Sequence, residues 1–206
     1  AEYSTVCSEV VDVAEALVAA PASDAAPGTT VELLLAIADT LKRAGDDLTA
    51  TDLLHRAARL AEAHRLTRLA SQAHNHAGIN LYCVGEYEGA MAEFDLALAG
   101  LPDDAYGAVR ALLIRMNRGN VVHDLKRFDE AEATFRDLLA RTGRTDPDAF
   151  AVHAPFGIDR FVGMLCHNAC TNRLEWARAD RGAGGRLGEH LAVAEGFLNQ
   201  AFARPL

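Results

Sequence analysis

The apolar residues of this chain recur at a helical spacing along almost its whole length. Runs with apolar positions at i, i+3, i+4 and i+7 alternate with short breaks that contain Gly, Asp or Pro. The alternating pattern of a half-buried strand is nearly absent. The pattern therefore predicts an all-α fold, with helices over residues 4–20, 30–44, 48–64, 67–84, 87–100, 106–125, 128–142, 158–179 and 187–202.

Two short signals mark helix starts. Thr29 and Glu32 have the spacing of a capping box, in which a hydroxyl and a carboxylate satisfy the first free N–H groups of a helix. Asp146 followed by Pro147 offers an N-cap side chain and then a proline at the first helical position. Residues 145–159 are otherwise expected to be irregular, and loops of that length in compact arrays tend to be functional or mobile.

A second regularity is a repeated set of small and aromatic residues. One copy consists of Gly85, Tyr87, Ala90, Phe94, Ala97, Leu98 and Pro102, and the next of Gly119, Phe128, Ala131, Phe135 and Leu138. A weaker earlier copy has Ala38, Gly45, Ala50, Leu54 and Ala57. The alanines at 50, 90 and 131 stand 40 and 41 residues apart, which is the spacing of a helix-pair repeat. Small residues at 78 and 90 are expected to let two antiparallel helices approach closely, and such pairs must stack to bury their apolar faces.

These residues resemble the tetratricopeptide repeat, whose signature has Gly or Ala in its first helix (helix A) and Gly-x-Tyr, Ala, Phe, Ala and Pro around its second (helix B). Residues 117–139 carry the closest match, and a period of about 40 resembles the longer repeats of bacterial sensor and regulator modules. The resemblance implies a right-handed superhelix of about four antiparallel helix pairs in one domain over 1–206. Its parts would be an N-terminal helix and linker (1–28), repeats at 31–64, 71–104 and 112–145, and a degenerate terminal helix pair (158–206).

In tetratricopeptide arrays the A helices line a concave groove, so the resemblance implies that the A helices of this chain line one too. The groove-facing or adjacent positions become Asn75, Ile79, Tyr82, Met116, Asn117, Asn120, His123, Asp124, His167, Asn168 and Thr171. Amide side chains both donate and accept hydrogen bonds, which suits a peptide backbone. The alternative is that these amides only tolerate a solvated face. Chaperone-type capture of a C-terminal carboxylate is not expected, because the second and third A helices contain no lysine.

Polar or small residues stand where packing residues are expected. His74, Arg115 and Cys166 precede the small helix A residue by four, and Arg118 lies one turn after Arg115. A buried guanidinium needs a carboxylate partner or an anion. Ion pairs with acids of neighbouring B helices are the simpler interpretation, and a polar pocket that receives an acidic group is the alternative.

Composition narrows the function further. A formal net charge of −9 argues against a nucleic-acid surface, and no apolar run is long enough to span a bilayer. The cysteines, at positions 7, 83, 166 and 170, have no CxxC spacing, so reduced thiols and a cytoplasmic location are expected. Cys166 and Cys170 share a helix face, and His123 on a neighbouring helix would be a third ligand for zinc. Buried thiols on a packing face are commoner, so no metal or cofactor is predicted.

The sequence carries no nucleophile elbow, phosphate loop or HExxH motif. The predicted function is therefore non-enzymatic recognition of a peptide or partner-protein segment, with a regulatory or scaffolding use implied by the resemblance. Two alternatives remain open. One is a small-ligand or enzymatic pocket that uses His74, Arg115, Arg118 and Cys166, and the other is an oligomerisation scaffold that forms a homodimer.

Overall fold

A computed structural model describes Ala16, residues 27–180 and residues 186–203 of the chain. Every regular element in this part is an α-helix, which confirms the all-α class. The helices are α2 (Pro27–Arg43), α3 (Asp47–Ala63), α4 (Thr67–Cys83), α5 (Tyr87–Ala99), α6 (Ala105–Asp124), α7 (Phe128–Thr142), α8 (Pro147–His153), α9 (Ile158–Asp180) and α10 (Leu187–Phe202). Within the described residues, no helix has both the length and the apolar content that a bilayer crossing requires.

Most helix ends fall within a residue or so of the positions that the sequence predicts. The prediction that Thr29 caps a helix is wrong, because α2 begins at Pro27 and Thr29 therefore lies inside its first turn. The N-cap at Asp146 is confirmed, since its side chain accepts a hydrogen bond from the N–H of Asp148. The expectation that 145–159 is irregular is wrong in part, because the cap and Pro147 start a short helix there, α8. The helix expected over 4–20 lies, apart from Ala16, outside the described residues.

Four of the turns between helices share one backbone geometry. Each is three residues long, and its middle residue, Gly45, Arg65, Gly85 or Lys126, has a φ of 85°, 56°, 85° or 62° respectively. In each turn the N–H of the next residue bonds a carbonyl oxygen five positions back. This is the Schellman helix ending, in which a left-handed residue satisfies the last free carbonyls. Because a helix and its turn take 20 residues here, the 40-residue step from Ala50 to Ala90 covers two helices and two turns.

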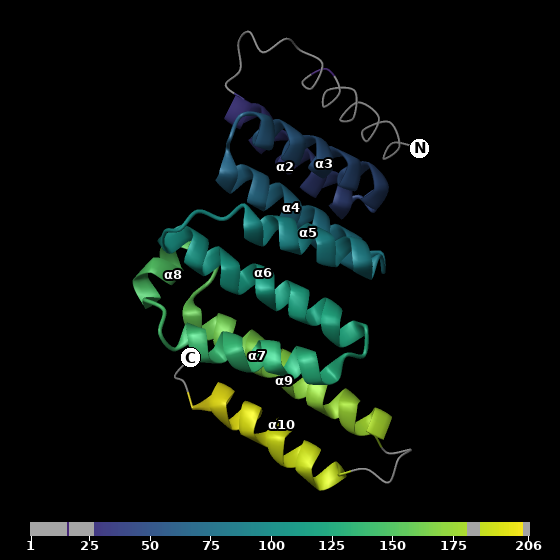
Figure 1. Ribbon diagram of the computed structural model, residues 1–206, viewed down its shortest axis with the longest axis vertical. Helices are drawn as coiled ribbons and strands as arrows, with labels where there is room; N and C mark the ends of the chain where they lie inside the picture. Colours follow the sequence, from purple (N-terminus) through teal and green to yellow (C-terminus); the bar gives the residue numbers. More distant parts are fainter. Residues whose placement is uncertain (1–15, 17–26, 181–185, 204–206) are drawn as a thin grey trace. The chain divides into compact units, whose positions relative to one another are not determined.

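The chain divides into two compact units, Ala1–Pro102 and Asp103–Leu206. In the first unit, α2 packs on α3, α3 on α4 and α4 on α5, and α2 also contacts α4 (Figure 1). Its core is formed by leucines and alanines on the facing sides of these helices. A Cβ atom built at Gly78 would lie 2.7 Å from a ring carbon of Phe94. The glycine is therefore what lets α4 approach α5, as the sequence predicts.

In the second unit, α7 lies between α6 and α9, and α10 packs on α9. Gly119 repeats the arrangement of Gly78, because a Cβ there would lie 3.0 Å from the ring of Phe135. The short helix α8 contacts α6 and α9, and it inserts the fully buried ring of Phe150 5.3 Å from that of Phe161, centroid to centroid. These contacts explain why the segment before α9 folds as a helix.

Candidate functional site

A groove of about 390 Å³ lies in the first unit, mainly between α2 and α4. Its lining residues are Ala38, Asp39, Lys42 and Arg43 of α2, Leu54 of α3, and His76 and Ile79 of α4. Ala38 and Lys42 are one helical turn apart, as are His76 and Ile79, so each helix presents one face to the groove. The aliphatic side chains of Ala38, Leu54 and Ile79 supply apolar lining.

The charges of the groove are not balanced. Arg43 forms an ion pair with Asp39 one turn earlier on α2. Lys42 is half-buried and makes no hydrogen bond or ion pair with any residue that the structure describes. A partly desolvated ammonium group is more favourable when an anion matches it. The groove therefore combines apolar lining with a positive group that an incoming anion would complement.

Three residues of α4 that the sequence selects as ligand contacts take different positions. Ile79 lines the groove. Asn75 is only 5% exposed, so its amide offers little to an outside ligand. Tyr82 is half-buried, and its ring lies 6.1 Å from that of Tyr87. Sequence analysis missed Lys42 and His76 as groove residues, although the position of Lys42 on the first A helix could have indicated it.

A chain of ionic contacts joins α3, α4 and α5 around His74, which is 8% exposed. The Nδ1 atom of His74 lies 2.7 Å from Oε2 of Glu93, and its Nε2 atom lies 3.1 Å from Oε1 of Glu62. The other oxygen of Glu93 lies 3.1 Å from Nε2 of His55. His74, a polar residue at a position where packing residues are expected, is therefore paired with carboxylates from the two neighbouring B helices, α3 and α5.

The pKa values of this cluster move in opposite directions. The hydrogen bond to Glu93 raises the pKa of His74 above 6.5; burial opposes this, and Glu62 adds to it. Burial alone would raise the pKa of Glu93, but the hydrogen bond and positive charge of His74, with a contribution from His55, hold it below 4.5. His74 is therefore favoured as an imidazolium whose two N–H groups both donate to carboxylates.

A second cavity, of about 270 Å³, opens beside His74. It is lined by Glu62, Arg65, Leu66, Thr67, Ala70, Ser71, His74, Leu96 and Gly100. The hydroxyl of Ser71 donates to the carbonyl oxygen of Ala97 at 2.8 Å. Because both ring nitrogens of His74 are bonded to carboxylates and the Ser71 hydroxyl is bonded to the backbone, these two side chains do not form a base and nucleophile pair.

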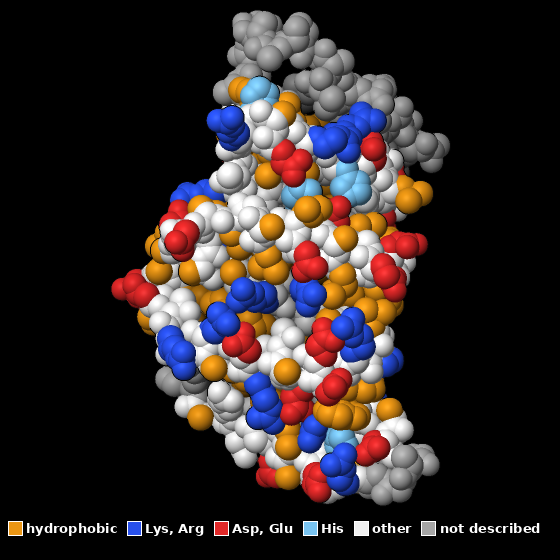
Figure 2. Space-filling view, in the orientation of Figure 1, with side chains coloured by type: hydrophobic (Ala, Val, Ile, Leu, Met, Phe, Trp, Pro, Cys, Tyr) orange, Lys and Arg blue, Asp and Glu red, His pale blue; other side chains and the backbone are white. Residues whose placement is uncertain are grey.

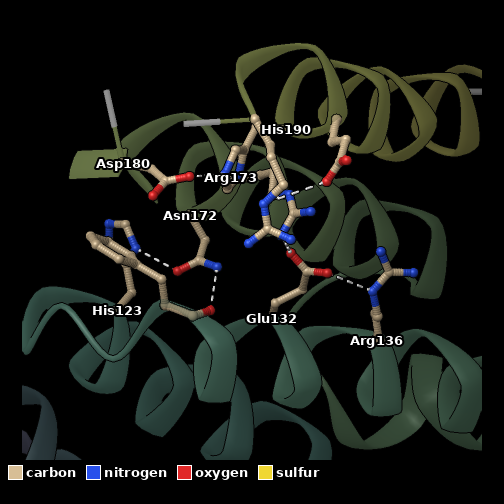
Figure 3. A network of polar contacts seen from close by, with 10 residues as sticks. His123, Glu132, Arg136, Asn172, Arg173, Asp180 and His190 are labelled. Carbon is tan, nitrogen blue, oxygen red and sulfur yellow. Dashed lines mark hydrogen bonds and ion pairs between the residues drawn. The ribbon is translucent and has the colours of Figure 1, made fainter. Parts of the chain in front are cut away.

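In the second unit, three of the selected residues form hydrogen bonds between helices: Asn120, Asn168 and His123. The Nδ2 atom of Asn168 donates to Oδ1 of Asn120 at 2.9 Å, which joins α9 to α6. Nδ1 of His123 lies 2.9 Å from Oδ1 of Asn172 (Figure 3). On its other side, Nε2 of His123 lies 3.5 Å from Oε2 of Glu175. Much of the hydrogen-bonding capacity that the sequence analysis assigned to a ligand is therefore used between helices.

Two buried asparagines hold helix starts in place. Nδ2 of Asn172 donates to the carbonyl oxygen of Phe128, the first residue of α7, at 2.8 Å (Figure 3). Nδ2 of Asn80 donates to the carbonyl oxygen of Asp47, the first residue of α3, also at 2.8 Å. Sequence analysis missed both. The sequence does show their equivalence. Gly78 and Cys170 occupy the same position of the helix A pattern, and each is followed two residues later by an asparagine, Asn80 or Asn172.

An arginine on α9 links to α7 in the same region. Nη1 of Arg173 donates to Oε2 of Glu132 at 2.9 Å, and Oε1 of Glu132 accepts from Nε of Arg136 at 3.0 Å (Figure 3). The guanidinium of Arg173 also lies over the ring of Trp176, 4.7 Å from its centroid. His190 of α10 packs edge-on to the same ring and approaches Asp180 at 3.3 Å. This cluster fastens α7, α9 and α10 together.

The remaining selected residues are spread over the second unit. Met116 and Cys166 are buried, His167 is exposed, and the others are half-buried: Arg115, Arg118, Asn117, Asp124 and Thr171. Burial raises the pKa of the neighbouring Cys170 thiol. No group of three His, Cys, Asp or Glu side chains in the described part of the chain could hold a metal ion.

Acidic and basic side chains are interspersed on the visible face of each unit, with hydrophobic side chains between them (Figure 2). Neither unit shows a continuous basic stripe on that face. The comparisons with protein-family models and with curated protein sequences gave no match to this chain.

Proposed function

We propose that this chain is a non-enzymatic recognition module of the tetratricopeptide type, which works in the cytoplasm and binds a segment of a partner protein in the groove of its first unit. The stacked antiparallel helices of that unit, joined by three-residue turns, support the helix-pair arrangement. A regulatory or scaffolding use follows from the resemblance to bacterial sensor modules.

The observation that carries the proposal is the groove between α2 and α4, with aliphatic lining and the half-buried Lys42 beside it, which has no acidic partner among the described residues. Its volume of about 390 Å³ lies within the range of roughly 300–1,000 Å³ that is usual for ligand pockets. An extended peptide would place an aliphatic side chain against Leu54 and Ile79. An Asp or Glu carboxylate next to it in the peptide would meet the ammonium group of Lys42.

A catalytic role for His74 is not proposed, because both of its ring nitrogens are already bonded to carboxylates. Asn75 is not given a contact role either, because it is buried. The contact set proposed for the ligand is therefore Ile79 from the original selection together with Lys42 and Leu54.

Selection of random peptides displayed on phage, with the purified full chain as bait, tests the proposal. Fluorescence anisotropy then measures how the enriched peptides bind wild type, Ile79→Glu and Lys42→Gln. We expect acidic and aliphatic residues to be adjacent in the enriched peptides, and each substitution to weaken binding by about tenfold or more. Val152→Glu, the same kind of apolar-to-acid change at a position 75% exposed on α8 of the second unit, is the matched control and should bind as wild type does.

The melting temperature of each variant shows whether it is folded. The proposal fails if no peptide is enriched. It also fails if folded Ile79→Glu binds the enriched peptides as tightly as wild type, because the ligand would then lie outside this groove.

A further inference from the structure

The last helix of the second unit, α10, exposes a stripe of large apolar side chains. The stripe consists of Leu187, Leu191, Leu198 and Phe202, which are 37%, 48%, 42% and 82% exposed. At 100° per residue these four positions fall within about 60° of one another around the helix axis, so they lie along one side of the helix. At 1.5 Å per residue the line is about 22 Å long.

The stripe is distinct from the face by which α10 packs in its own unit. That face is formed by His190, Ala194 and Phe197, all of them buried. His190 contacts Trp176 of α9, and Phe197 lies under the guanidinium of Arg136 of α7. The apolar side of α10 is thus wider than the surface that α9 and α7 cover. The uncovered part is the stripe.

Among the described helices, α10 exposes the largest number of large apolar side chains. The four side chains together expose roughly 400 Å², which matches the largest apolar patch on a typical monomer. In the rest of the described chain, the exposed large apolar residues each stand on a different helix or turn: Leu33, Leu48, Val84, Leu96, Val152 and Leu174. Single exposed apolar residues need no explanation, whereas a line of four marks an interaction surface.

We propose that this stripe is covered by the same stripe of a second copy of the chain, with the two α10 helices antiparallel. The spacing along the stripe is four, seven and four residues, and it is the same from either end. An antiparallel copy related by a two-fold axis between positions 194 and 195 therefore places Leu187 against Phe202 and Leu191 against Leu198. This self-matching is the requirement of a symmetric, isologous interface.

The net charge of the chain determines how association of two copies through the stripe should respond to salt. Each copy carries a formal net charge of −9, so two copies repel one another at long range. Added salt screens that repulsion and leaves apolar burial unaffected or stronger. Dimerisation through the stripe should therefore tighten as ionic strength rises, whereas docking of a basic partner on this acidic chain would weaken.

Sedimentation velocity of the full chain between about 1 and 100 µM, the range in which modest apolar interfaces associate, measures the mass directly. We expect the wild type to move from monomer to dimer as concentration rises. Leu191→Glu and Leu198→Lys should each remain monomeric. Leu48→Glu, which replaces an even more exposed leucine on α3, should dimerise like wild type. Far-UV circular dichroism checks that each variant keeps its helices.

Mixing the two monomeric variants tests the antiparallel pairing itself. In an antiparallel dimer of Leu191→Glu with Leu198→Lys, the new acid faces the new base and the other pair remains Leu against Leu. The one-to-one mixture should therefore recover the dimer mass. A wild type that stays monomeric, a folded Leu191→Glu that still dimerises, or a mixture that stays monomeric would each overturn the proposal. None of these outcomes depends on peptide binding by the first unit.

Discussion

Replacing Gly78 by alanine tests the contact between α4 and α5 on which the first unit is built. The new methyl group would lie 2.7 and 2.8 Å from two ring carbons of Phe94. Ordinary contacts of a Cβ atom start at about 3.4 Å, so the ring or a helix must move by more than half an ångström. Phe94 is fully buried, so its ring has no free space to move into.

Two opposing terms decide the magnitude. Alanine in place of glycine inside a helix stabilises by about 0.5–1 kcal/mol. Forcing an extra methyl into a close-packed core costs about 1–3 kcal/mol. We therefore expect Gly78→Ala to destabilise the first unit by about 1–2 kcal/mol. Gly163→Ala is the matched control, because nothing lies within 4 Å of a Cβ at Gly163 and only the stabilising term remains.

Urea unfolding measures both variants. Circular dichroism reports on helices of both units, whereas the fluorescence of Trp176, the chain's one tryptophan, reports on the second unit. The double variant Gly78→Ala with Phe94→Leu separates the clash from other effects, because the smaller leucine makes room for the methyl group. Its loss of stability should be smaller than the sum of the two single losses by about 1 kcal/mol. The reasoning is refuted if Gly78→Ala is as stable as Gly163→Ala, or if the double variant is strictly additive.

Three further predictions concern the contacts that hold the helices together. Because the pKa of His74 is raised on folding, its ion pairs stabilise the fold fully below pH 6.5, and this contribution is lost as the pH rises through the raised value. Because the pKa of Glu93 is lowered on folding, its carboxylate stabilises the fold fully above pH 4.5, and this contribution is lost as the pH falls through the lowered value. Urea midpoints should therefore fall on either side of about pH 5–6, and His74→Gln should flatten the decline on the alkaline side; an unchanged profile would contradict the role of the ion pair. Arg65→Gly should raise stability by up to about 1 kcal/mol in thermal unfolding, because Arg65 holds a φ of 56° that glycine adopts freely, and a loss of stability would mean that its side chain matters more than its backbone. Asn172→Ala should cost about 1–3 kcal/mol in urea, since it removes the amide hydrogen bond to the carbonyl of Phe128 and leaves Nδ1 of His123 without its partner. A change below about 0.5 kcal/mol would show that water replaces the amide.

Much of the helical arrangement was predictable because its causes are local. Helix ends depend on capping side chains, left-handed turn residues and prolines that lie within a few positions of the boundary. Gly78 and Phe94 also belong to a spacing that can be read along the chain. The mistake at Thr29 has a local origin as well, because a capping pair occurs by chance and Pro27 is itself a favourable helix start.

The polar residues were harder to interpret, because their partners are distant in sequence. Asn120 and Asn168 were selected as ligand contacts, yet they bond each other across 48 residues. The sequence pattern places an amide on a helix face, but whether a neighbouring helix presents a matching group to it depends on how the helices pack. The same holds for His74, whose two carboxylates lie 12 and 19 residues away.

The sequence by itself determined that the chain is helical, where most helices start and stop, and which small residues allow close packing. These properties follow from short-range sterics and from the period of the apolar residues. Only the tertiary structure decided that Lys42 stands beside the groove without an acidic partner among the described residues, that His74 is enclosed between Glu93 and Glu62, and that α10 is left with an uncovered stripe. The physical reason is that charge balance and exposure are properties of neighbours in space, and packing chooses those neighbours.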